Sequence, residues 1–168
     1  MGPRSDHQAG RSYGRRGQTP VIGAGQRFRC NVTSTLGDRG DLAFAAFREN
    51  FAVPVFLRFL GRLPWHGGGR KVFLIVDRPS VHKVRGVTCW LAARANKIAL
   101  FLLPGCSPEL NPDELLNQNV KTNVPGPLGP GDPAEMPGDA RAYLRRTQKQ
   151  PRLVRRYFPE RHVRYAAA

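Results

Sequence analysis

An uninterrupted apolar run that ends on a charge, KVFLIVD at residues 71–77, most constrains how this chain can fold. Such a run is typical of a strand that is buried on both faces of a parallel sheet. A second run of this kind, KIALFLLP, occupies residues 97–104. The segment between them has helical spacing, with Val84, Thr88, Leu91 and Ala95 on one stripe. Strand, helix and strand predict a right-handed crossover that joins two parallel strands.

The sequence before and after this unit predicts the remaining elements. Residues 27–36 alternate in polarity, LGDRGD follows as a turn, and residues 42–47 resume, which together indicate an antiparallel hairpin. Apolar residues at helical spacing predict a helix over residues 53–63. Another helix is expected to begin near Pro112, with Asn111 as its N-cap. The order of elements predicts an α/β fold with a mixed sheet and flanking helices.

The net charge of +15 and its uneven placement indicate a polyanionic partner, and nucleic acid is the first candidate. Residues 1–30 hold six arginines and one aspartate, and residues 141–168 hold nine basic side chains and one acidic side chain. The interior is nearly neutral. We expect the DNA contacts to come from these two ends, at Arg11, Arg15, Arg16, Arg141, Arg145, Arg146 and Lys149. A basic, solvated surface without a specific partner is the alternative.

Composition also predicts the organisation of the chain. Five prolines and four glycines in residues 124–138 indicate a linker between a core at 1–123 and a basic helix and tail at 139–168. In that helix Ala140, Tyr143, Leu144 and Thr147 form one apolar face. Three widely spaced cysteines suggest neither a zinc site nor a disulfide framework. No apolar run approaches the roughly 20 residues that span a bilayer, so we expect a cytoplasmic protein without a membrane partner.

Acidic side chains lie where the predicted strands end. Asp77 closes the first apolar run, and Glu109, Asp113 and Glu114 lie just past the second. In open α/β sheets, functional groups gather at the carboxyl ends of strands. Converging carboxylates provide the hard oxygen ligands that Mg²⁺ or Mn²⁺ prefers, and two such ions can assist phosphoryl transfer. A strand-end aspartate that caps the next helix is the alternative interpretation of Asp77.

The segments VFLIVDRPSVHKVRGVTCWLA and IALFLLPGCSPELNPDELLNQNVK resemble the catalytic core of insertion-sequence transposases in the mariner-related DDE superfamily. The family pattern is a strand that ends in Asp, a His five residues on, and a strand that leads to L-P-x-x-S-P-x-L-N-P-x-E. The matching residues here are Asp77, His82, Leu103, Pro104, Ser107, Pro108, Leu110, Asn111, Pro112 and Glu114.

This resemblance implies an RNase H-like fold and a two-metal nuclease and strand-transferase mechanism that uses Mg²⁺ or Mn²⁺. It implies that Asp77 is the second acidic ligand and Glu114 the third, with Asp113 as a close competitor. His82 would lie near the site, where it would touch a phosphate or orient Asp77. The partners implied are transposon-end and target DNA and a second copy of the chain, in a bacterial, nucleoid-associated setting.

Departures from the family pattern limit what we expect of the chain. The family's first catalytic Asp belongs on an opening strand ahead of the matched segments, and Asp6 is a poor substitute for it. Arg78 stands beside the second ligand, where a cation would compete with Mg²⁺. We therefore expect an N-terminally truncated core that lacks its first strand and cleaves DNA weakly or not at all. The alternatives are a non-catalytic DNA-binding remnant and a subunit completed in trans by an upstream polypeptide.

Overall fold

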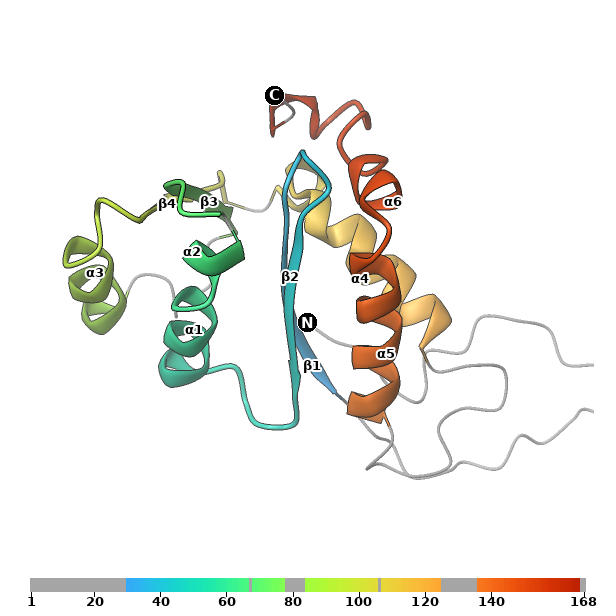
Figure 1. Cartoon of the computed structure of the whole chain (residues 1–168), viewed down its shortest axis with the longest axis horizontal. Helices are drawn as coiled ribbons and strands as arrows, with labels where there is room; N and C mark the ends of the chain where they lie inside the picture. The colour runs from blue at the N-terminus through green and yellow to red at the C-terminus, as the bar shows by residue number, and fades with distance from the viewer. Residues whose placement is uncertain (1–29, 67, 78–83, 106, 125–135, 167–168) are drawn as a thin grey trace, which may run out of the picture.

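The computed structural model of the chain describes residues 30–66, 68–77, 84–105, 107–124 and 136–166. Strands and helices are mixed along the chain, and their layout is shown in Figure 1. The elements are β1 (Asn31–Leu36), β2 (Leu42–Phe47), α1 (Val53–Leu60), α2 (Leu63–His66), β3 (Val72–Val76), α3 (Arg85–Ala92), β4 (Ile98–Leu102), η2 (Pro108–Leu110), α4 (Pro112–Asn123), α5 (Met136–Gln148), α6 (Pro151–Arg155) and η3 (Arg164–Ala166).

The hairpin prediction is confirmed. β1 pairs antiparallel with β2 in a continuous register that runs from Asn31 opposite Phe47 to Leu36 opposite Leu42. The turn is closed by the Gly37 amide, which donates to the Asp41 carbonyl at 2.8 Å. Gly40 adopts a φ of +95° in this turn, a backbone conformation that favours glycine.

The strand–helix–strand unit is confirmed as well. β3 pairs parallel with β4, from Val72 opposite Ile98 to Val76 opposite Leu102, and α3 lies between them in the chain. Within the described residues the two pairs form separate two-stranded sheets, where the sequence predicts a single mixed sheet. The chain therefore has the expected α/β, RNase H-like composition of elements, with its strands divided into two halves.

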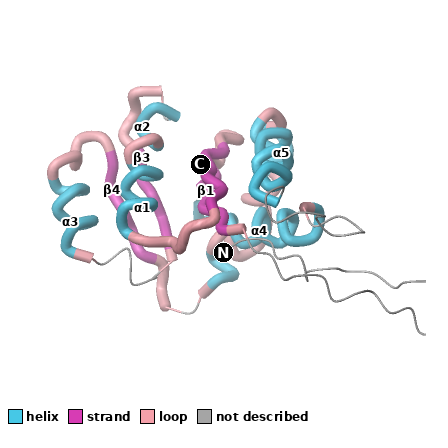
Figure 2. The backbone as a smooth tube through the Cα atoms, turned by 90° about the horizontal axis from the view of Figure 1, so that it is seen from below, coloured by secondary structure: helices cyan, strands magenta, loops and turns pink. Residues whose placement is uncertain are grey.

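Each half of the molecule has its own apolar core. One core joins the hairpin to α4, α5 and α6, and contains Val32, Leu116 and Leu144. The other joins β3 and β4 to α1, α2 and α3, and it also contains Ala43 of β2. The hairpin thus contributes to both cores. Figure 2 shows it between the β3–β4 pair on one side and α4 and α5 on the other.

The prediction that both apolar strands are buried on two faces is wrong. Leu74 is 5% exposed beneath α1 and α3, whereas Phe73 is 65% exposed and Ile75 is 41% exposed on the opposite face of β3. Phe101 of β4, which lies opposite Ile75, is 52% exposed. The sequence does not distinguish the two faces, because apolar residues occupy both while described helices cover only one.

Helix boundaries differ from the predictions in two places. The helix expected over residues 53–63 ends at Leu60, and a separate short helix, α2, begins at Leu63. α5 begins at Met136, inside the expected linker. The face predicted for that helix is confirmed: Ala140, Leu144 and Thr147 are buried.

The apolar stripe predicted for the third helix is wrong. Val84 has an extended backbone at the N-cap of α3, so it does not belong to the helix. The buried residue of α3 is Val87, whose side chain is fully covered, while Thr88 is exposed. The helix is therefore turned away from the predicted stripe by packing against β3 and β4. No helix in the described ranges has the length and apolar character needed to cross a membrane.

Candidate active site

Asp77 follows the last residue of β3, at the carboxyl end of the parallel pair. The Leu103 amide donates to the Val76 carbonyl at 2.8 Å, so the pairing of β3 and β4 continues up to the residue before Asp77. The apolar run forms the strand because its branched and aromatic side chains suit a pleated, half-buried surface. The carboxylate is half-buried where the strand meets the loop.

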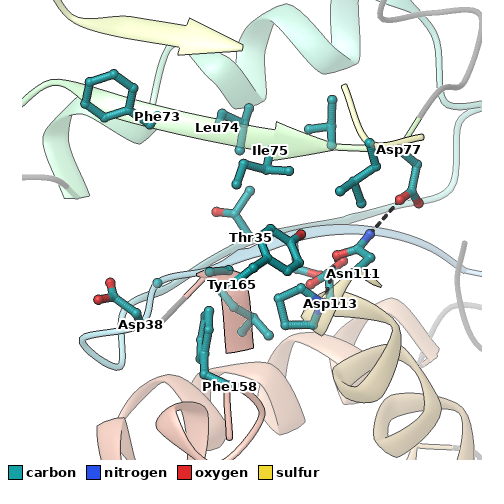
Figure 3. A pocket seen from close by; sticks show the side chains of 17 residues that line it. Thr35, Asp38, Phe73, Leu74, Ile75, Asp77, Asn111, Asp113, Phe158 and Tyr165 are labelled. Carbon is teal, nitrogen blue, oxygen red and sulfur yellow. Dashed lines mark hydrogen bonds between the residues drawn. The ribbon is translucent and has the colours of Figure 1, made fainter. Parts of the chain in front are cut away.

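Asn111 connects Asp77 to the start of α4. Its side-chain amide donates to Asp77 Oδ1 at 2.9 Å, and its oxygen accepts from the Asp113 backbone amide at 3.0 Å. Figure 3 shows the first of these bonds across the pocket. The second bond is the predicted N-cap, and Pro112 is preorganised for the first helical position. The predicted helix start is confirmed, and its capping residue also holds the strand-end carboxylate.

Asp113 lies in the first turn of α4 and faces the hairpin. The Ser34 hydroxyl of β1 donates to Asp113 Oδ1 at 2.7 Å, which joins residues that are 79 positions apart. Burial raises the pKa of Asp113 from 3.8 to about 6; the Ser34 hydrogen bond lowers this pKa, and the charges of Glu114 and Asp77 raise it. Asp77 and Asp113 therefore lie close enough to influence each other electrostatically.

A pocket of about 250 Å³ connects these groups. Its walls come from the end of β1, most of β3, the start of α4 and the C-terminal segment. The Tyr165 hydroxyl donates to the Leu110 carbonyl at 2.8 Å, and its ring points into the pocket in Figure 3. Burial and then the charge of Asp77 raise the pKa of Tyr165. Sequence reasoning missed Ser34 and Tyr165; the aromatic character of the tail was the only signal of the latter.

The pocket separates the two sheets. One edge of β1 pairs with β2, and one edge of β3 pairs with β4. The pocket lies between β1 and β3. In Figure 3, Asp38, which follows β1, lies on the side of Phe73. Asp113, which is bonded to Ser34 of β1, lies on the side of Asp77. The two strands therefore run past each other in opposite directions. This is the relation that two strands have when a third strand between them is parallel to β3 and antiparallel to β1.

The remaining predicted ligands are placed as follows. Glu114 lies in the first turn of α4 but is not part of the pocket wall, whereas Asp113 is. His82 lies outside the described residues, as do Arg78, Arg11, Arg15 and Arg16. In the described part of the chain, no group of three or more His, Cys, Asp or Glu side chains is arranged to hold a metal ion. Asp77 and Asp113 supply carboxylate oxygens to one pocket, and this is the ligand type that Mg²⁺ prefers.

The predicted basic residues of α5 are exposed, as expected, and divide between two directions. Arg141 and Arg145 face β2 across a groove, and the Arg141 guanidinium donates to the Ala46 carbonyl at 3.0 Å. Arg146 lies over the Tyr143 ring at 5.9 Å from its centroid. Lys149 lies beyond the end of α5. The four residues therefore do not form one continuous contact surface.

Comparison with known proteins identifies the chain from its sequence. Residues 1–126 match the family described as DDE superfamily endonuclease. A search of curated proteins found no match, and neither did a search of solved structures. The matched region includes both apolar strands, the Asn111 cap and the carboxylates of the pocket. The chain therefore belongs to the DDE superfamily endonucleases, a family of nucleases that act on DNA.

Proposed function

We propose that this chain carries out metal-dependent DNA strand cleavage and transfer in DNA transposition, as an insertion-sequence transposase of the mariner-related type. The observation that supports this proposal best is the convergence of Asp77, Asn111 and Asp113 in one pocket. Asp77 comes from a strand end and Asp113 from a helix start, and Asn111 bonds both. Asn111 thus links the Asp77 carboxylate to the backbone at the start of α4, where Asp113 lies.

In this proposal Asp77 and Glu114 hold Mg²⁺ or Mn²⁺, with Asp113 as the competing ligand. A bound ion would supply charge stabilisation for the attacking and leaving oxygens of the phosphodiester. Asp113 lines the pocket and is bonded to Ser34, while Glu114 is the next residue of the helix. Adjacent helical residues point about 100° apart, so one of the two faces Asp77. Asn111 holds the Asp77 carboxylate in a fixed orientation through its amide.

We further propose that the chain alone cleaves DNA weakly. The described pocket wall supplies three carboxylates, of which Asp77 and Asp113 lie toward one end and Asp38 lies at the far end. Two carboxylates balance the charge of one divalent ion, and a second ion would need further acidic ligands. His82, proposed to touch a phosphate or orient Asp77, would add hydrogen bonding without adding negative charge.

Nicking of supercoiled plasmid in the presence of Mg²⁺ or Mn²⁺ tests the proposal. The wild-type chain is compared with Asp77→Asn and with Asp38→Asn, a matched control at the far end of the same pocket. Weak nicking that is lost in Asp77→Asn and kept in Asp38→Asn supports the enzyme. Equal nicking by all three chains contradicts it. If none nicks and all bind DNA, the chain is a non-catalytic DNA-binding protein, the alternative function.

Parallel variants assign the other ligand. If Glu114 is the metal ligand, Glu114→Gln should abolish nicking and Asp113→Asn should preserve part of it. The reverse pattern assigns the role to Asp113. Metal dependence is measured for each variant, because the loss of a ligand raises the Mg²⁺ concentration needed for half-maximal rate.

The space between β1 and β3 supports a second candidate function. In it, the chain is a subunit whose active site is completed by a segment of a separate polypeptide. Neither strand has a described partner on the side that faces the pocket. A peptide in extended conformation would pair with both edges and would end beside Asp77 if it ran parallel to β3. An aspartate at that end would supply the third carboxylate.

Addition of an extended apolar peptide that ends in aspartate tests this second function. The expected result is increased nicking by the wild-type chain, with little effect from the same peptide ending in asparagine. A peptide with a central proline is the second control, because proline has no backbone N–H and so removes a hydrogen bond from the ladder. If the aspartate and asparagine peptides act alike, completion in trans is wrong.

A further inference from the structure

A second groove lies along the outer edge of β2, on the far side of β1 from the candidate active site. Figure 1 shows β2 between α1 and α5, and this groove of about 520 Å³ is lined by residues of all three elements. Its floor is apolar and includes Phe44, Phe47 and Phe59. Its rim is cationic.

Two pairs of arginines face each other across the groove. Arg58 lies on α1 and Arg62 follows just after that helix, while Arg141 and Arg145 lie on α5. Arg141 and Arg145 are four residues apart within α5, which places both side chains on one face of that helix. All four residues are exposed. The spacing along α5 was visible in the sequence, but the partnership with α1 was not.

The groove has a net positive charge, because arginines outnumber acidic residues among the described residues that line it. Glu49 is the one acidic residue among the described residues that line it. Four guanidinium groups around one carboxylate repel each other, and an anion in the groove would relieve this repulsion. The planar guanidinium group matches the geometry of phosphate, to which it can donate two parallel hydrogen bonds.

Side chains from α5 donate hydrogen bonds to backbone carbonyl groups along the β2 edge. The Arg141 guanidinium donates to the Ala46 carbonyl, and the Gln148 amide donates to the Leu42 carbonyl at 2.6 Å. An added strand would need these carbonyls for its own hydrogen bonds. The groove is therefore poorly suited to an extended peptide, which distinguishes it from the space between β1 and β3.

We propose that this groove binds the phosphodiester backbone of duplex DNA, with Arg58, Arg62 and Arg145 as phosphate ligands. Arg141 positions the wall through its bond to Ala46 and contributes charge. The ligand class rests on the proposed function, in which DNA is the substrate. The groove adds a binding surface within the folded core to the basic arms that the sequence suggests.

Salt-dependent binding to a 30-base-pair duplex, measured in EDTA, tests the groove separately from catalysis. The groove variant carries Arg58→Gln, Arg62→Gln and Arg145→Gln. The matched control carries Arg152→Gln, Arg156→Gln and Arg161→Gln, three exposed arginines outside the groove. Both variants lose the same formal charge. Circular dichroism and thermal unfolding establish that each is folded.

We expect the groove variant to bind at least tenfold more weakly than wild type. Its slope of log affinity against log salt should fall by about 2 to 3, because each phosphate contact contributes about 0.9 to that slope. The control should retain a slope within about 1 of wild type. Equal losses in both variants, or no loss in the groove variant, would overturn the proposal.

Further outcomes separate this groove from the proposed function. If wild type binds duplex DNA and the groove variant binds equally well, the groove assignment fails and the nuclease proposal stands. If wild type binds no DNA at any salt concentration, both fail. Polyglutamate and unlabelled DNA are also compared as competitors at the same charge concentration. If polyglutamate competes as effectively as DNA, the groove binds an acidic protein partner and the assignment is overturned.

Discussion

The Asn111 side chain donates to Asp77 Oδ1 at 2.9 Å while its oxygen accepts from the Asp113 backbone at 3.0 Å. One residue therefore caps a helix and holds a strand-end carboxylate. Both interactions depend on an amide, which carries a donor and an acceptor on the same planar group. The helix start and the candidate catalytic aspartate consequently move together.

Substitutions at Asn111 separate these two roles. Asn111→Ala should lower the free energy of unfolding by about 1 to 3 kcal/mol, because it removes the cap and the bond to Asp77. Asn111→Ser keeps a good N-cap and loses only the bond to Asp77, so its loss should be about 1 kcal/mol smaller. Urea denaturation provides both values. Equal losses in the two variants would show that the cap contributes nothing.

The raised pKa of Asp113 predicts that stability decreases as pH rises. A carboxyl group that binds its proton more tightly in the folded state is stabilising when protonated, so its contribution is complete below pH 4. The contribution is lost as pH rises from about 4 through about 6. The change is at most about 3 kcal/mol. Asp113→Asn should flatten this part of the profile and raise stability above pH 6.

Ser34→Ala provides the complementary measurement. The Ser34 hydroxyl lowers the pKa of Asp113, so its removal should raise this pKa further and shift the decrease in stability to higher pH. Denaturant midpoints between pH 4 and 8, measured for wild type and both variants, isolate the contribution of this carboxyl. An Asp113→Asn variant that shows the wild-type profile would exclude Asp113 as its source.

Two neighbouring residues of β3 test the open face of the second sheet. Leu74→Ala should lower the free energy of unfolding by about 2 to 5 kcal/mol, because it leaves a cavity under α1 and α3. Phe73→Ala should cost less than about 1 kcal/mol, since the Phe73 side chain is 65% exposed. Chemical denaturation compares them. A large loss for Phe73→Ala would indicate that this face is covered in solution.

Gly40 tests the conformation of the hairpin turn, and Gly61, at the C-cap of α1, serves as the comparison. A Cβ at Gly40 would lie 2.6 Å from the Pro151 carbonyl oxygen, at a φ of +95°, so Gly40→Ala should destabilise the chain by about 1 to 3 kcal/mol. Gly61 has a helical φ of −62° and ordinary contacts, so Gly61→Ala should be neutral or stabilise by up to about 1 kcal/mol. Thermal unfolding ranks the variants. Similar melting temperatures would contradict the docking of the turn on α6.

Much of the local structure could be predicted because it depends on neighbours in the chain. The alternation around the LGDRGD turn predicted β1 and β2, and Asn111 followed by Pro112 predicted the start of α4. The face of α5 followed from the spacing of Ala140, Leu144 and Thr147. The position of Asp77 at the end of an apolar run predicts a carboxylate at a strand end, and Asp77 follows the last residue of β3.

The failures concern contacts between distant segments and the exact ends of helices. Phe73 and Leu74 look alike in sequence, yet only Leu74 is covered, because α1 and α3 pack on one face of β3. Val84 was placed on a helical stripe, although the helix begins after it. Periodicity predicts which residues share a face but does not specify what covers that face.

The sequence by itself determined the order of elements, the carboxylates at the strand and helix ends and the family to which the chain belongs. These follow from local propensity and from a motif that is contiguous or nearly so. Only the tertiary structure decided that Ser34 bonds Asp113, that Tyr165 enters the pocket and that Arg58 faces Arg141 across a groove. Such pairings depend on how two apolar cores pack around the hairpin, which no single segment encodes.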